Sequence, residues 1–569
     1  MNKIQSTSKY RLASLAVAVL TLVASQAQAQ VAKPYFEFKK PKAVLSSLDV
    51  SVGDITPASQ VFNASGAYVM GFEGISQYDL TALGKNAIPP DTIGAVGANQ
   101  YMTTTNGVYG VYDKFTGVRT SRVTDTAFWA AAGQVGASGD SRVMYNSTAN
   151  RWIAMSFGAN VKDLQIAVSD TSDALGSWKS TKFEGYAGMG FGGTADYPTL
   201  ALDRNAVYIG TNNFAPATAG GANSFRGTTL NVIPLNSLFS AAPSTENMTR
   251  FFTPYDGAPG AINADRGFAI QGVNSNKAGS SGKVLATSLF NADTMTYKVN
   301  GLLPNSATAA SLSASVGIGE KGFESPSDAH QPSVAIAANR NIVAAGDERT
   351  SSSIYEANGR IYMVKTVDPT VNGVADESRI RYTVLDANTN AILDQGDIGQ
   401  AGYDYYQGSI AVNDAGQVVI GYNRSGLDAL TGKISFMGQS FSTGVDGHLI
   451  SKSGELLLKE SLTDDYHNGS VFGQASVGRQ RWGDYSSVSV DPTDSSKFYL
   501  IGEFAREYNN DAGGHPGGSG GSRWGTWVAV IDANVAAVPE PSTWLMLVCG
   551  MSAVGFVANR RRRNEGSAS

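Results

Sequence analysis

The stretch YQGSIAVNDAGQVVIGYN, Tyr406 to Asn423, is the clearest indication of the fold. It starts with polar residues, alternates small and apolar residues, turns at Asn-Asp-Ala-Gly and closes on Asn. The period of two and the turn chemistry indicate a β-hairpin rather than a helix. Similar stretches recur at 89–106, 139–157, 196–213, 330–348 and 483–503. A further copy is expected at Arg266 to Phe290, in the wide gap before residue 330.

This repeat predicts the architecture. Most units start roughly fifty to eighty residues apart, which is long enough for four short strands each. One four-stranded sheet cannot bury both of its faces alone, but sheets packed radially can. We therefore predict an all-β fold, a β-propeller of about seven blades, over residues 89–533, after an irregular leader at 30–88. Six blades remain an alternative, and an array of β-sandwiches is the competing fold.

The composition argues against nucleic-acid binding and against chemistry that depends on cysteine or histidine. Of 569 residues, 42% are hydrophobic and only 16% are charged, with 64 glycines and a net charge of −5. A chain without a basic field has little attraction for nucleic acid, so we expect no nucleic-acid partner. The single cysteine, Cys549, lies near the C-terminus, and the four histidines are scattered. We expect no disulfide, no cysteine nucleophile and no metal site built on these residues.

Both ends of the chain carry targeting features. At the N-terminus a basic start is followed by an apolar run, Leu12 to Ala24, and by the small-x-small pattern Ala27-Gln28-Ala29. This order is typical of a cleaved secretory signal peptide. We assign it to residues 1–29 and expect export through the Sec machinery.

The C-terminus combines Pro539-Glu540-Pro541, an apolar run from Trp544 to Ala558, and an arginine cluster. The cluster consists of Arg560, Arg561, Arg562 and Arg563. A short apolar span followed by arginines predicts a transient inner-membrane span whose end stays in the cytoplasm. Residues 538–563 resemble the PEP-CTERM sorting signal. A simple C-terminal membrane anchor is the alternative.

That resemblance implies processing by an exosortase, a membrane transpeptidase-like enzyme, in a Gram-negative bacterium that makes extracellular polysaccharide. The expected localisation is export, an inner-membrane intermediate, and then the cell surface or extracellular matrix. Within the body, TSDALGSW (Thr171 to Trp178) resembles the Asp-box turn of sialidase-like propellers, with its glycine one place late.

The body from Pro89 to Asp532 resembles an uncharacterised group of secreted bacterial proteins that carry the motifs PPDT, YDKxTG, DYPTL and RWGDYSS. The resemblance implies a sialidase-like propeller and brings no established activity.

In a propeller, the starts of the first strands and the ends of the second strands meet at one rim around the axis. Two carboxylates that flank a sugar can hydrolyse a glycoside, and arginines can hold a substrate carboxylate. The candidate catalytic residues are Asp196, Asp484, Glu503, Arg142, Arg424 and Arg481. The candidate ligand-binding residues are Tyr197, Tyr406, Tyr485, Asn212, Asn423 and Gln331. Equivalent rim positions without an assigned role include Asp91, Asp140, Gln407 and Arg349.

Three functions stay open. The favoured one is a non-enzymatic propeller that binds polysaccharide or a surface protein. The alternatives are a sialidase-like glycoside hydrolase and a purely structural matrix scaffold. Asp and Asn at the rim can also simply cap turns and tie blades together. No cofactor is expected, although the Asp-rich turn DPTDSSKF (Asp491 to Phe498) offers oxygen ligands of the kind that Ca²⁺ takes.

Overall fold

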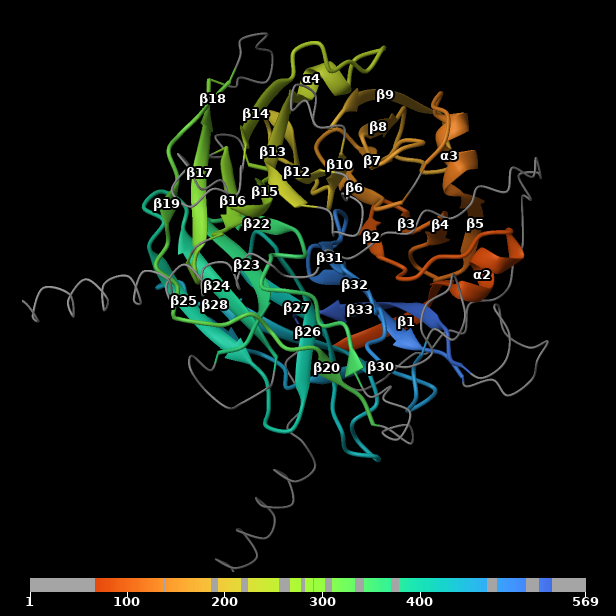
Figure 1. The fold of residues 1–569 in the computed structure, drawn as a ribbon, viewed down its shortest axis with the longest axis vertical. Coiled ribbons are helices and arrows are strands. Elements are labelled where there is room, and N and C mark those ends of the chain that lie inside the picture. Colours follow the sequence, from red (N-terminus) through yellow and green to blue (C-terminus); the bar gives the residue numbers. More distant parts are fainter. Residues whose placement is uncertain are drawn as a thin grey trace, which may run out of the picture.

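The computed structural model describes residues 67–534 except 138, 186–192, 216–223, 255–266, 278–281, 290, 302–309, 333–341, 370–377, 468–477 and 508–520. In this part of the chain antiparallel strands form seven blades arranged around a common axis (Figure 1). The fold is therefore a seven-bladed β-propeller, as the repeat predicts.

The first three blades follow one another along the chain. Blade 1 contains β2 (Ile93–Val96), β3 (Gln100–Thr105), β4 (Val108–Asp113) and β5 (Arg119–Thr124). Blade 2 contains β6 (Arg142–Asn146), β7 (Arg151–Phe157), β8 (Asp163–Ser169) and β9 (Trp178–Glu184). Blade 3 contains β10 (Thr194–Asp196), β11 (Ala201–Leu202), β12 (Ala206–Ala215), β13 (Ser224–Pro234) and β14 (Thr249–Pro254). Short helices flank these strands: α2 (Gln77–Ala82), α3 (Asp125–Ala131) and α4 (Leu235–Leu238).

Blades 4 and 5 are joined edge to edge. Blade 4 contains β15 (Phe268–Asn274), β16 (Lys283–Thr287), β17 (Thr294–Asn300), β18 (Ser311–Leu312) and β19 (Val316–Gly317). Blade 5 contains β22 (Ile354–Ala357), β23 (Arg360–Val367), β24 (Arg379–Asp386) and β25 (Ile392–Ile398). Their first strands pair in parallel, Val273 with Ile354 and Asn274 with Tyr355, which merges the two blades into one continuous sheet.

The last two blades close the ring. Blade 6 contains β26 (Asp404–Val412), β27 (Gln417–Ser425), β28 (Ser435–Thr443), β29 (Leu449–Ser451) and β30 (Leu456–Glu460). Blade 7 contains β31 (Ser487–Val490), β32 (Lys497–Ala505) and β33 (Trp524–Asp532), and β1 (Tyr68–Ser76) supplies its outermost strand. The antiparallel pairing of β1 with β33 fixes the beginning of the ring to its end.

The first strands define two faces of the propeller. We call the face where they begin the start face and the opposite one the end face. In blade 7, β31 runs away from the start face, β32 returns to it, and β33 runs back to the end face. Tyr68 pairs with Ile531, so the described chain enters and leaves the ring at the end face.

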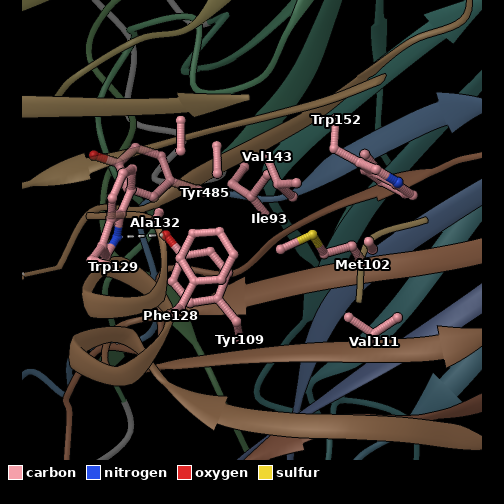
Figure 2. Packing of buried hydrophobic residues seen from close by; sticks show 14 of the residues in the cluster. Ile93, Met102, Tyr109, Val111, Phe128, Trp129, Ala132, Val143, Trp152 and Tyr485 are labelled. Carbon is pink, nitrogen blue, oxygen red and sulfur yellow. Dashed lines mark hydrogen bonds between the residues drawn. The ribbon is translucent and has the colours of Figure 1, made fainter. Parts of the chain in front are cut away.

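Apolar side chains fill the spaces between blades. Between blades 1 and 2, Phe128 stacks on Tyr109 with 4.2 Å between ring centroids, and the fully buried Trp129 donates to the Tyr109 hydroxyl over 3.2 Å. Figure 2 shows Tyr485, which precedes β31, in the same cluster as Ile93 and Val143. The start of blade 7 is thereby anchored against the first two blades.

The prediction was wrong at one unit and one boundary. Residues 333–341 of the predicted unit 330–348 lie outside the described residues. The described ones contribute to a pair of two-residue strands, β20 (Ala329–His330) with β21 (Ile342–Val343), which forms a sheet of its own outside the seven blades. The fifth blade is β22–β25 instead, and its first strand, Ile-Tyr-Glu-Ala, lacks the long alternation that marks the other units. The propeller also begins at Tyr68, inside the segment interpreted as a leader, because an outermost strand carries no first-strand signature.

Other predictions concern the chain ends and one turn. TSDALGSW forms the turn between β8 and β9, where Trp178 packs edge-on against Phe128 at 5.0 Å. The signal peptide 1–29 and the sorting signal 538–563 lie outside the described residues. Within the described part, no helix has the length and apolarity to cross a membrane.

Candidate functional site

The start face carries a repeated backbone feature around the axis. At the beginning of blades 1, 2, 3, 4 and 6, a residue other than glycine adopts a left-handed conformation. These residues are Asp91 (φ 49°), Asp140 (φ 51°), Tyr197 (φ 51°), Ala269 (φ 53°) and Gln407 (φ 52°). This conformation is uncommon for non-glycine residues, so the packing around it must hold it in place.

Asparagines near the ends of second strands help to hold these left-handed residues in place. The Asn106 side chain accepts the Asp140 backbone N–H over 2.8 Å, and the Asn212 side chain accepts the Ala269 N–H over 2.9 Å. Asn423 donates over 2.9 Å to the Glu503 carbonyl. Each bond joins one blade to the next. Asn212 and Asn423, candidate ligand residues from the sequence, therefore use their amides to tie blades together.

Five carboxylic side chains converge at this face, and we call them the acid cluster. Its members are Asp91 of blade 1, Asp140 of blade 2, Asp196 of blade 3, and Asp484 and Glu503 of blade 7. The Asp484 N–H donates to Asp91 over 2.8 Å, and Asn106 donates to the other Asp91 oxygen over 2.7 Å. Residues nearly four hundred positions apart are thus joined where the ring closes.

Burial and mutual repulsion raise the pKa values of four members of the cluster, Asp91, Asp140, Asp196 and Glu503. Burial, followed by the nearby Asp196 and Asp484, raises the pKa of Asp140 to about 7. Asp196 stays partly exposed, but the protein around it removes much of its hydration and raises its pKa to about 6, with Asp484 adding to the rise and Arg349 and Arg481 opposing it. The pKa values of Asp91 and Glu503 lie well above their ordinary range, first because of burial and then because neighbouring carboxylates repel their charge.

Glu503 is the most enclosed member of the cluster. Its side chain is fully buried, and neither carboxylate oxygen makes a hydrogen bond of ordinary geometry to a described residue. The same holds for both polar atoms of the neighbouring Gln407 amide. Gly483 leaves the space that these groups occupy, because a Cβ at this position would overlap the Glu503 carboxylate.

An arginine–tyrosine layer, made of Arg349, Tyr197, Tyr485 and Arg142, lies next to the cluster. The two tyrosine rings are 5.0 Å apart, with the Arg349 guanidinium 4.2 Å from the Tyr197 centroid and the Arg142 guanidinium 3.6 Å from that of Tyr485. The Tyr485 hydroxyl donates to Asp140 over 2.9 Å. Both tyrosines are buried, so their rings pack against arginines and do not face solvent.

The remaining candidates have partners of their own. Arg424 donates to Glu455 over 2.7 Å and lies over the Tyr403 ring on blade 6. Tyr406 is fully buried, with its hydroxyl 3.2 Å from that of Ser425. Gln331 exchanges two hydrogen bonds with the Tyr466 backbone. The structure thus brings together Asp196, Asp484, Glu503, Arg142, Arg481, Tyr197 and Tyr485.

Asp91, Asp140, Gln407 and Arg349 complete the site, although the sequence interpretation gave them no role. The sequence feature that could have identified them is their position, because all four occupy rim positions of the repeat. In the turn Asp491 to Phe498, considered as a Ca²⁺ site, the first acid already has a partner. Both Asp491 oxygens accept hydrogen bonds from the buried Lys114 ammonium, over 2.7 and 2.9 Å. Among the described residues, no group of three or more His, Cys, Asp or Glu side chains is placed to hold a metal ion.

A cavity of about 340 Å³ runs along the axis on the other side of Arg142. Residues of β2, β6, β11, β15, β22, β26 and β31 line it. Its wall reaches Ser147, Lys277, Asp414 and Ser495 in the loops of the end face. The acid cluster and this cavity therefore occupy the two ends of one axis.

No protein-family profile matches the chain. No curated protein matches it either. Solved structures with some likeness include an endo-arabinase from Bacteroides thetaiotaomicron, with 13% identity, 64% of this chain and 88% of that chain covered, and a TM-score of 0.27. An α-L-arabinofuranosidase from Fusarium graminearum has 8% identity, 83% and 99% coverage and a TM-score of 0.34. The WD40 domain of SCAP from fission yeast has 7% identity, 76% and 82% coverage and a TM-score of 0.28. Likenesses this distant say nothing about chemistry.

Proposed function

We propose that the propeller is a glycoside hydrolase that acts on extracellular polysaccharide, with Asp196 and Asp484 as its two carboxylic groups. One observation carries the proposal: Asp196 and Asp484 are the members of the acid cluster that stay partly exposed, whereas Asp91, Asp140 and Glu503 are buried. The tyrosines expected to present rings to a sugar are buried as well, which favours hydrolysis over surface binding.

The two groups suit different steps. With a pKa raised to about 6, Asp196 keeps a substantial protonated fraction in mildly acidic solution and can donate a proton to the leaving oxygen. Asp484 lies 3.5 Å from the Arg481 guanidinium, an arrangement that suits a carboxylate facing the developing positive charge on the sugar. Arg349 and Arg481 both act on Asp196 and hold its pKa below the value that burial alone would give.

The proposal includes export and sorting through residues 1–29 and 538–563. β33 ends at Asp532 on the end face, six residues before the sorting signal begins, and the acid cluster lies on the start face. A tail attached at the end face would leave the acid cluster open to a polymer outside the cell. This arrangement supports an outward-facing hydrolase at the cell surface or in the matrix.

The test is a panel of bacterial and plant polysaccharides incubated with the purified chain, with release of reducing ends as the readout. Asp196→Asn and Asp484→Asn should each lower turnover by about 10²-fold or more, the usual contribution of a positioned acid or base. Asp428→Asn, an exposed substitution in a loop of the same face, is the control and should change nothing. Turnover should fall as the pH rises above about 6, because Asp196 loses its proton. Binding without turnover would replace the proposal by a polysaccharide-binding function.

A further inference from the structure

The axial cavity ends at an arginine, Arg142, whose guanidinium forms no ion pair with any described residue. Arg142 is the first residue of β6, so it lies at the end of the cavity nearest the start face. Its side chain is 7% exposed, and Nε donates to the Pro198 carbonyl over 2.9 Å. Its two Nη groups make no hydrogen bond or ion pair with any residue in the described part of the chain.

Two other buried arginines of the propeller have carboxylate partners. Arg381 holds Asp397 with two bonds of 2.7 and 2.9 Å, and Arg349 pairs with Asp347. Arg142 instead rests on the Tyr485 ring and lowers the pKa of Asp140 without forming an ion pair with it. A buried guanidinium with unused donors is costly unless something acidic meets it.

The cavity has the properties of a small-molecule site. Its volume of about 340 Å³ lies at the lower end of the range for such pockets. Apolar side chains such as Val143, Leu200 and Val488 share the wall with neutral polar ones such as Ser353 and Asn276. Besides Arg142, four charged residues line the wall. Lys277 and Asp414, at the end face, pair with each other over 3.3 Å, Asp491 pairs with the buried Lys114, and Glu356 lies on β22.

We propose that the axial cavity binds a small organic carboxylate, whose two oxygens accept hydrogen bonds from the Nη groups of Arg142. The planar guanidinium offers two parallel donors that match a carboxylate, and the enclosed position strengthens the bond. The body of the ligand lies toward the end face, against the mixed wall. Neither Asp196 nor Asp484 lines this cavity, so the inference does not depend on the proposed hydrolysis.

Isothermal titration of the purified full chain tests the proposal with two carboxylates and their neutral counterparts. Glucuronate is compared with glucose, and hexanoate with hexanol, so that the arms separate a sugar acid from an aliphatic one. At least one carboxylate should bind about tenfold or more tighter than its neutral counterpart, the effect of a charge-assisted hydrogen bond. It should also raise the melting temperature.

Two substitutions then locate the site. Arg142→Met should weaken binding about ten- to hundredfold, whereas Arg142→Lys should keep part of it. Arg151→Met is the matched control, because Arg151 also donates to backbone carbonyls and lies over an aromatic ring, Phe239, but does not line the cavity. Ser353→Phe should block the cavity while leaving Arg142 in place, which covers the case in which Arg142→Met does not fold.

Several results would overturn the inference. The first is that neither carboxylate binds up to about 10 mM, the weak end of specific affinity. The second is that the neutral counterparts bind equally well. The third is that binding is unchanged in both Arg142→Met and Ser353→Phe. Asp196→Asn and Asp484→Asn should still bind the carboxylate, because neither residue lines the cavity. Loss of turnover in those variants with retained carboxylate binding would therefore separate the two proposals.

Discussion

Replacing Asp140 by Asn should stabilise the protein in neutral and alkaline solution but not in acid. The substitution keeps the shape of the side chain and an oxygen that accepts the Tyr485 hydroxyl. Asparagine also tolerates the left-handed backbone at this position, where φ is 51°. What changes is the removal of a buried acid whose charge is disfavoured by burial and by Asp196 and Asp484.

The magnitude follows from proton linkage. The pKa of Asp140 rises from the ordinary 3.8 to about 7 on folding. Below the unfolded value both states hold the proton. As the pH rises from about 4 to about 7, the unfolded chain releases its proton and the folded protein does not, so the free energy of unfolding falls by about 1.4 kcal/mol per pH unit. The loss comes to about 4 kcal/mol at pH 8, and Asp140→Asn should recover it.

Urea unfolding followed by tryptophan fluorescence at pH 3.5, 6 and 8 measures the difference between variant and wild type. The gain should be near zero at the lowest pH and about 4 kcal/mol at the highest. Asp386→Asn is a control of opposite sign, because donation from the Thr389 N–H and hydroxyl holds the pKa of Asp386 below its usual value. An equal gain at all three pH values, or a loss at pH 8, would mean that ionisation of Asp140 does not limit the stability.

Two further substitutions test contacts that hold the ring together, in the same unfolding assay. Lys114→Met leaves the buried Asp491 without its cation and should lower the free energy of unfolding by about 3–5 kcal/mol. Combining it with Asp491→Leu should restore most of that loss. A Lys114→Met variant as stable as the wild type would contradict this. Gly483→Ala pushes a methyl group into the Glu503 carboxylate and should cost about 1–3 kcal/mol. Glu503→Ala in the same chain should remove most of that loss, and additive losses would speak against a direct overlap.

Local pattern was enough to predict the propeller. The alternation in Tyr406 to Asn423 reappears as β26 and β27, and the equivalent stretch at 483–503 gives β31 and β32. The fifth blade escaped prediction because β22 is four residues long and pairs sideways with β15, a contact between positions some eighty residues apart. The outermost strand β1 escaped because its partner, β33, lies at the other end of the chain.

The sequence predicted which residues lie at the rim but not which of them are buried. The repeat placed polar residues at the rim, and Asp196, Asp484 and Glu503 do meet there. Which of them are buried depends on packing between blades that are distant in sequence, such as the bond from Tyr485 to Asp140 across 345 positions. Pattern alone therefore could not show that the tyrosines pack against arginines while Asp196 and Asp484 keep their exposure.

The two proposed sites meet at Asp140. The charge of Arg142, which lines the axial cavity, lowers the pKa of Asp140, and the charge of Asp196, which belongs to the acid cluster, raises it. A carboxylate bound at Arg142 would cancel part of the field that favours ionised Asp140, and the pKa of Asp140 would rise further. A protonated Asp140 would in turn repel the charge of Asp196 less and lower its pKa. Because such coupling is reciprocal, the protonation state of the acid cluster would set the affinity of the cavity as well.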